Sequence, residues 1–140
     1  DAAVVAAAAA EPHGVNAAGI AAAGVWRECV QYAVMQGAEL DTFNGLAGVG
    51  DLLATGMAEG SRNRRAGELL GRDTPPDQVR REIGQASEAL DSVPQIAATV
   101  AASGCPAESL QGLADLATGR IGSEEWVAAL RRVGHKRRAA

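Results

Sequence analysis

A long stretch without proline, residues 15–37, constrains the fold of this chain more than any other feature. Its larger apolar side chains recur close to the period of an α-helix, at Ile20, Val25, Cys29, Tyr32 and Met35. The spacing predicts one helix from about residue 16 to residue 36. Gly19 and Gly24 within it each cost roughly 1 kcal/mol relative to alanine, so we expect another helix or a ligand to come close there.

The rest of the chain points to the same fold class, because no stretch alternates convincingly as a strand. Hydrophobic residues make up 47% of the 140 residues, but aromatic residues only 3%. A core of Ala, Leu, Val and Ile favours closely packed helices over a β-sandwich. We therefore predict a compact all-α domain at residues 1–134, followed by a basic C-terminal tail at residues 135–140.

The predicted helices cover residues 2–10, 16–36, 52 onward, 62–70, 78–83, 85–103, 106–117 and 123–133, with a turn at 41–43 and a linker at 73–76. Pro94 lies inside one of them and predicts a break or kink. Ser123, with Trp126 behind it, is a plausible cap and hydrophobic staple of the last helix.

Residues 43–65, FNGLAGVGDLLATGMAEGSRNRR, place an acid, a hydroxyl and an arginine cluster around glycine-rich turns. Asp51 and Thr55 are four apart, so on a helix they share one face and can converge on a small ligand. Ser61 can cap the following helix, with Gly71 as its C′ residue. Arg62 and Asn63 then lie in a first turn, where free N–H groups, the positive dipole end and a guanidinium suit a phosphate.

Each of these features also has a purely structural interpretation. A glycine-rich turn ahead of an acid is a weak signal on spacing alone. Arg62, Arg64 and Arg65 can form a solvated helix face, which is the usual fate of a charge run. Arg64 and Arg65 point to other faces than Arg62, so Arg62 is the preferred phosphate ligand.

Three motifs together, GLAGVGDLLAT, SRNRRAGELLG and IGQASEAL, resemble the C-terminal substrate domain of bacterial-type NAD-dependent glycerol-3-phosphate dehydrogenase. The resemblance runs from about Gly14 to about Leu90. It implies the helical C-terminal half of a two-domain enzyme similar to 6-phosphogluconate dehydrogenase. In the family an N-terminal Rossmann domain holds NAD or NADP, and the reaction is the reversible reduction of dihydroxyacetone phosphate to sn-glycerol 3-phosphate for phospholipid synthesis.

The resemblance also implies roles for the residues on either side of the substrate. Asp51 matches the acid that hydrogen-bonds the reacting part of the substrate and the catalytic lysine, and Thr55 matches a hydroxyl in the same pocket. We therefore expect these two residues to be catalytic.

Other matched positions bind phosphate or cofactor in the family. Arg62 and Asn63 match the phosphate-binding pair, with Ser61 beside them and the arginine also near the cofactor. Gln85 and Glu88 match positions on the cofactor side of the cleft.

The catalytic lysine of the family has no counterpart in this chain, which has no lysine before Lys136. Counting back from Asn16 and Asp51 puts it about two residues before Asp1, and a general acid must lie within hydrogen-bonding reach of the developing alkoxide. GLAGVGD is not a dinucleotide fingerprint either. We expect a truncated domain that is inactive alone. The alternative is a non-catalytic, diverged paralogue that binds a phosphometabolite or serves as a dimerisation module.

The charge and the cysteine content limit which other partners and cofactors we expect. A net charge of -4 gives no field that would draw the chain to nucleic acid or an anionic membrane. The apolar run at residues 2–10 is too short to span a bilayer. Cys29 and Cys105 suggest no disulfide framework, so we expect a cytoplasmic location. They do not suggest a zinc site, and His13 and His135 lack the spacing of metal ligands, so we expect no metal. A homodimer is a possible assembly.

Overall fold

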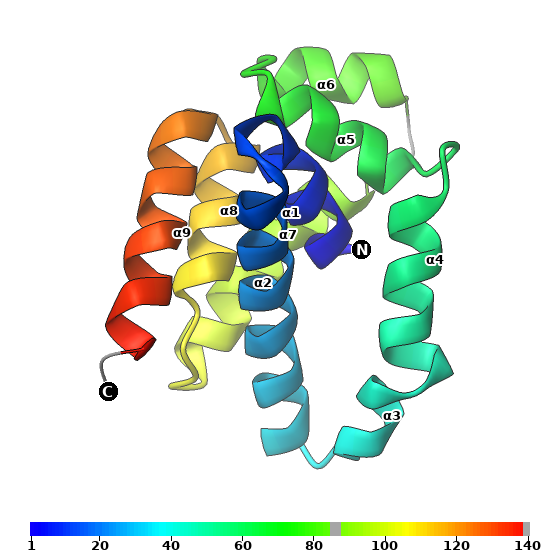
Figure 1. Ribbon diagram of the computed structural model, residues 1–140, viewed down its shortest axis with the longest axis vertical. Helices are drawn as coiled ribbons and strands as arrows, with labels where there is room; N and C mark the ends of the chain where they lie inside the picture. Colours follow the sequence, from blue (N-terminus) through cyan, green and yellow to red (C-terminus); the bar gives the residue numbers. More distant parts are fainter. Residues whose placement is uncertain (85–87, 139–140) are drawn as a thin grey trace.

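The computed structural model describes residues 1–84 and 88–138, and these residues form helices without any strand (Figure 1). The all-α prediction is confirmed. The elements are α1 (Ala2–Ala10), the short helix η1 (Glu11–His13), α2 (Val15–Met35), α3 (Leu40–Asn44), the π-helix η2 (Leu46–Gly50), α4 (Asp51–Met57), α5 (Arg62–Gly71), α6 (Pro76–Ile83), α7 (Glu88–Ala102), α8 (Glu108–Ala117) and α9 (Ser123–Arg138).

Helix α1 lies at the centre of the molecule, with α2 and α5 packed directly against it (Figure 1). Its buried residues are Ala3, Val4, Val5, Ala6, Ala8, Ala9 and Ala10. A helix that is apolar on nearly every side is stable in water only where neighbours cover every side. Leucines of α5, α7 and α8 and the fully buried Trp126 of α9 complete the same core.

Two glycines of α5 allow its close contact with α1. A Cβ atom at Gly67 would overlap the Val5 carbonyl, and one at Gly71 would overlap the Ala9 carbonyl. The two glycines are four apart and so share one helix face. The prediction that Gly71 follows the helix as a C′ residue is wrong, because α5 includes Gly71 and the chain turns at Asp73, whose φ is 56°.

The two glycines of α2 that we expected to lie close to another helix or a ligand have different surroundings. A Cβ at Gly24 would lie 2.6 Å from Ser109 Oγ of α8, whereas nothing lies within 4 Å of one at Gly19. The expectation is confirmed for Gly24; no helix comes close to Gly19, where the approach of a ligand stays a prediction. One turn after Gly24, the fully buried Glu28 accepts the N–H groups of Ser109 (3.0 Å) and Leu110 (2.9 Å) and so caps α8.

Helix α7 continues through Pro94, so the predicted break is wrong, and the alternative, a kink, stays a prediction. Proline removes one N–H donor from the helix, and the fully buried Leu90, Val93 and Ala97 hold the flanking turns in place by packing. A short helix, α3, replaces the turn predicted at residues 41–43, and α9 extends to Arg138 instead of ending near residue 133.

The start of α9 is capped by a different residue from the one predicted. Asp73 Oδ1 accepts the N–H of Ser123 (2.7 Å), and Asp73 Oδ2 accepts its hydroxyl (3.1 Å). Ser123 is therefore capped, and the sequence-based cap assignment is wrong. Asp73 tolerates its left-handed backbone conformation better than most residues, and these hydrogen bonds hold it there.

Residues 40–57, comprising α3, η2 and α4, form an arm at the edge of the molecule (Figure 1). Gly48 is the one buried residue in the arm. We call the remaining described helices the body. The arm leaves the body after α2 and returns to it at α5, so the predicted site residues are divided between the two regions.

Candidate functional site

The start of α5 is an open helix N-terminus with cationic and amide side chains. Ser61 has extended backbone, and its hydroxyl accepts the N–H of Arg64 at 3.2 Å, which confirms the predicted cap. The first turn contains no acidic residue. Arg62 is exposed and makes no hydrogen bond or ion pair with another described residue. Its guanidinium is therefore free to bind an anion at the positive end of the helix dipole.

Asn63 connects this helix start to the start of α1. Its Nδ2 donates to Asp1 Oδ1 at 2.6 Å. The contact follows from the glycine-lined crossing of α1 and α5, which places the two N-terminal ends side by side. Asn63 of the predicted phosphate-binding pair thus lies next to Asp1, the residue before α1.

The glycine-rich motif forms a π-helix that leads into α4. The N–H groups of Gly48 and Gly50 both donate to the Gly45 carbonyl at 3.2 Å. A Cβ at Gly48 would overlap the Phe43 carbonyl, so only glycine fits there. π-Helical turns are rare and often occur at functional sites.

Asp51 and Thr55 lie one turn apart on α4, as predicted, with Asp51 exposed and Thr55 half-buried. Neither side chain has a hydrogen-bond partner among the described residues. Asp51 lies in the first turn, where the helix dipole favours a carboxylate. No hydrogen bond or ion pair between described residues joins this pair to Arg62 or Asn63.

Of the three residues predicted on the cofactor side, only Arg62 has a described side chain. Gln85 lies outside the described residues, and so does the side chain of Glu88, whose backbone begins α7.

Arg64 has a larger structural role than the sequence indicated. Its guanidinium contacts Glu68 in α5, Glu11 in η1 and the Gly56 carbonyl in α4. The i,i+4 pair with Glu68 could be read from the sequence. The contacts with Glu11 and Gly56 depend on the tertiary fold, which local spacing does not reveal.

Two cavities adjoin Arg64, and neither is lined by Asp51, Thr55, Arg62 or Asn63. One, of about 200 Å³, lies between α1, α2 and the end of α4 and is lined by Val4, Ala7, Ala8, Glu11, Val15, Ala18, Gly56 and Arg64. The other, of about 420 Å³, is lined by Ala8, Glu11, Pro12, Arg64, Glu68 and Arg72. The predicted site residues therefore lie outside both cavities.

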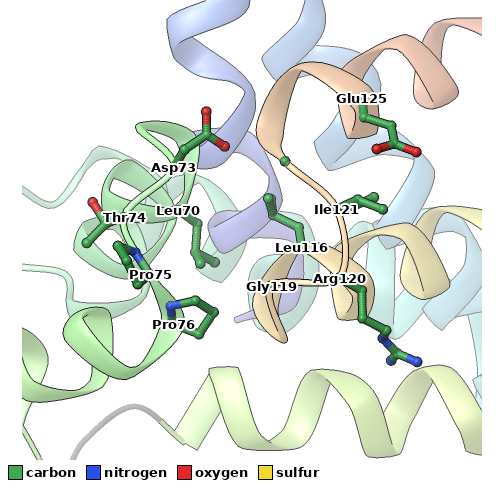
Figure 2. Close-up of a pocket in the computed structure, with 11 residues that line it drawn as sticks. Leu70, Asp73, Thr74, Pro75, Pro76, Leu116, Gly119, Arg120, Ile121 and Glu125 are labelled. Carbon is green, nitrogen blue, oxygen red and sulfur yellow. The ribbon is translucent and has the colours of Figure 1, made fainter.

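A third cavity, of about 400 Å³, lies between the loop at residues 73–76 and the loop before α9 (Figure 2). Two of its charged groups already have partners, because Asp73 caps α9 and Arg120 pairs with Asp115 at 3.1 Å. His13 Nε2 lies 3.1 Å from Ser123 Oγ beside it. In a hydrolase triad the histidine stands between the acid and the serine, whereas here the buried Ser123 stands in the middle, so this is a structural network.

The cysteines have the environment of structural residues. Burial raises the pKa of the Cys29 thiol, and the neighbouring Glu28 carboxylate raises it further. Cys105 Sγ lies 3.6 Å from Met35 Sδ. Among residues 1–84 and 88–138, no group of three or more His, Cys, Asp and Glu side chains is arranged to hold a metal ion. Over the same residues, no helix combines the length and apolar character needed to cross a membrane.

Residues 2–128 match the model of the family described as NAD-dependent glycerol-3-phosphate dehydrogenase C-terminus. The chain belongs to this family of helical C-terminal domains.

Individual relatives agree with this assignment. The chain is 46% identical to glycerol-3-phosphate dehydrogenase [NAD(P)+] of Legionella pneumophila (strain Corby) over 71 residues, which are 51% of this chain and 22% of that protein. It is 39% identical to the enzyme of that name from Mycobacterium avium (strain 104) over 77 residues, 55% of this chain and 23% of that protein. The matched region spans less than a quarter of these relatives.

A solved structure extends the similarity beyond the motif region. The crystal structure of glycerol-3-phosphate dehydrogenase from Coxiella burnetii superimposes with a TM-score of 0.73 and 25% sequence identity. The superposition covers 91% of this chain and 41% of that chain. The fold predicted from the resemblance, the helical C-terminal half of a two-domain dehydrogenase, is confirmed.

Proposed function

We propose that this chain provides the substrate-binding half of a glycerol-3-phosphate dehydrogenase, which reversibly reduces dihydroxyacetone phosphate to sn-glycerol 3-phosphate. The free Arg62 guanidinium at the open start of α5, with Asn63 beside it, is the observation that carries the proposal. Arg62, Asn63 and Ser61 bind the phosphate group, for which a bidentate guanidinium and free helix N–H groups are suited.

The arm provides the reacting end of the site. Asp51 and Thr55 bind the carbonyl or hydroxyl end of the substrate, because both are unpaired polar groups on one face of α4. A lysine about two residues before Asp1 would be the general acid. The contact between Asp1 and Asn63 supports this role, because Asp1, about two residues after that position, lies beside Asn63.

NAD or NADP supplies the hydride in this proposal and is bound mainly by an N-terminal Rossmann domain, with Arg62, Gln85 and Glu88 on the cofactor side. An exposed apolar surface supports such a partner domain. The large hydrophobic side chains that are exposed among the described residues all lie in α2 and the arm: Val15, Ile20, Val34, Met35, Leu40, Leu46, Leu53 and Met57. Large exposed apolar patches mark interaction sites, and the concentration of these side chains on two regions supports a partner there. A cytoplasmic homodimer that serves phospholipid synthesis is part of the same proposal.

The experiment joins a Rossmann domain from a relative, ending in the Lys-Asn helix start of the family, directly ahead of Asp1. We expect this fusion to oxidise NADH with dihydroxyacetone phosphate, and the loss of NADH absorbance measures the rate. We expect the 140-residue chain alone to be inactive. An inactive fusion that binds NADH and is folded would contradict the proposal and favour a non-catalytic module. Turnover by the chain alone would require a different proton donor.

A further inference from the structure

Arg64 connects the arm to the body where α4 ends. Its Nη1 donates to the Gly56 carbonyl at 2.8 Å, and its Nε lies 3.0 Å from Glu68 Oε1. Its Nη2 lies 3.5 Å from Glu11 Oε2. The three partners belong to α4, α5 and η1, so one guanidinium joins three elements.

Each partner suits a guanidinium. Gly56 lies in the last turn of α4, where carbonyl groups lack intrahelical donors and carry the negative end of the helix dipole. The carboxylates of Glu68 and Glu11 compensate the arginine's charge. A planar guanidinium has donors pointing in several fixed directions, whereas a lysine ammonium is a single point charge. Arginine is therefore the side chain that can hold all three partners at once.

The arm has few other attachments. At its far end the Phe43 ring meets the Trp26 ring of α2 edge to face, with centroids 6.1 Å apart. At the end near α5 the chain closes a short turn, in which the N–H of Ser61 donates to the Ala58 carbonyl at 3.0 Å. Leu52 of α4 packs half-buried against the core, but Gly48 is the one fully buried residue between these points, so core packing gives α4 little support beyond Leu52.

We propose that Arg64 is a positioning residue that sets α4 relative to α5, and thereby Asp51 and Thr55 relative to Arg62 and Asn63. Residues two apart on a helix do not share a face, so Arg62 is available to substrate while Arg64 binds the arm. The effect on catalysis rests on the proposed function, but the structural tie, by which we mean the contacts of Arg64 with Gly56, Glu68 and Glu11, does not. Loss of the tie moves the reacting end of the site and leaves the phosphate end on α5 in place.

The structural tie is tested by hydrogen exchange of the 140-residue chain. Arg65→Gln is the matched control, because Arg65 is the next residue on α5 and its ion pairs with Glu68 and Glu82, at 3.5 and 3.9 Å, do not reach the arm. We expect Arg64→Gln to speed exchange in residues 51–57 on the order of tenfold, with α1 and α5 unchanged. Arg64→Lys should recover part of the protection. Wild-type exchange in α4, or equal loosening of α4 and α5, would overturn the proposal.

The kinetic consequence is tested in the active fusion. Arg64→Gln should lower kcat on the order of 10- to 100-fold, because small displacements of reacting groups are costly, while KM changes less than about threefold. Arg64→Lys should restore part of kcat, and Arg65→Gln should leave both parameters near wild type. A raised KM with unchanged kcat would contradict a positioning role. If the parent fusion is inactive, the proposed function fails and the exchange measurement alone decides the tie.

Discussion

The body and the arm are stabilised in opposite ways. In the body, seven residues of α1 are buried, and Gly67 and Gly71 bring its backbone against α5 without intervening side chains. In the arm one residue is fully buried, and its orientation depends on the half-buried Leu52, one ring contact and one guanidinium. The proposed site takes its phosphate ligands from the body and its reacting-end ligands from the arm. Binding and chemistry can therefore be perturbed separately.

The largest effect is expected from a substitution that removes the phosphate-binding side chain from the body. In the active fusion, Arg62→Ala should cost roughly 2 to 4 kcal/mol of transition-state stabilisation, because a charge-assisted contact to phosphate is lost. Arg65→Ala should cost much less, since its ion pairs are half-exposed. Equal, small changes in kcat/KM for both variants would show that the arginines form only a solvated face.

The next effect tests close packing in the body. Gly67→Ala should destabilise the chain by about 1 to 3 kcal/mol, because the new methyl group meets the backbone of α1 and not a movable side chain. Gly19→Ala, on an open part of α2, should stabilise it by up to about 1 kcal/mol. Urea unfolding measures both free energies. A neutral Gly67→Ala variant would show that the crossing is looser than described.

A smaller effect tests the far anchor of the arm. Phe43→Leu removes the edge-to-face contact with Trp26 and should cost the arm about 0.5 to 1.5 kcal/mol of local stability. Hydrogen exchange should quicken in residues 40–50 and stay unchanged in α1. Leu46→Ala is the control, because Leu46 is 88% exposed and such substitutions change stability by less than about 0.5 kcal/mol. Loosening of α1 by Phe43→Leu would contradict the division into two regions.

The smallest expected effect concerns Cys29 in the body. Burial, and then Glu28, raise the pKa of its thiol above the ordinary value of 9.0. Above that pH the unfolded chain loses the thiol proton more readily than the folded chain, so stability declines as pH rises. Cys29→Ala should make this decline shallower when unfolding is followed from pH 8 to pH 10, about one unit either side of the unperturbed thiol pKa. An unchanged slope would show that the thiol is not desolvated.

Much of the fold could be predicted because it follows from local signals. The proline-free run of α2, the Ser61 cap and the poverty of aromatic residues each indicate helices without any tertiary information. The errors occurred where tertiary contacts override local preference. Packing carries α7 through Pro94, Asp73 caps a helix fifty residues away from it, and Gly71 serves a helix crossing instead of a helix end.

The candidate site was predictable to a different degree in its two halves. The start of α5 is a local motif, so Ser61, Arg62 and Asn63 could be assigned from spacing. Residue spacing also placed Asp51 and Thr55 on one helix face. It could not show that the two groups belong to separately held regions, or that Arg64 joins them, because the contacts with Glu11 and Gly56 cross between elements.

The most direct test of a site divided between body and arm is a backbone NMR titration of the 140-residue chain with two ligands. Inorganic phosphate should shift the amide signals of residues 61–63 alone, and sn-glycerol 3-phosphate should shift these together with the signals of residues 51 and 55. Arg62→Ala should abolish both responses. Shifts centred on the cavity at residues 73–76, or arm signals that respond to inorganic phosphate alone, would contradict the account.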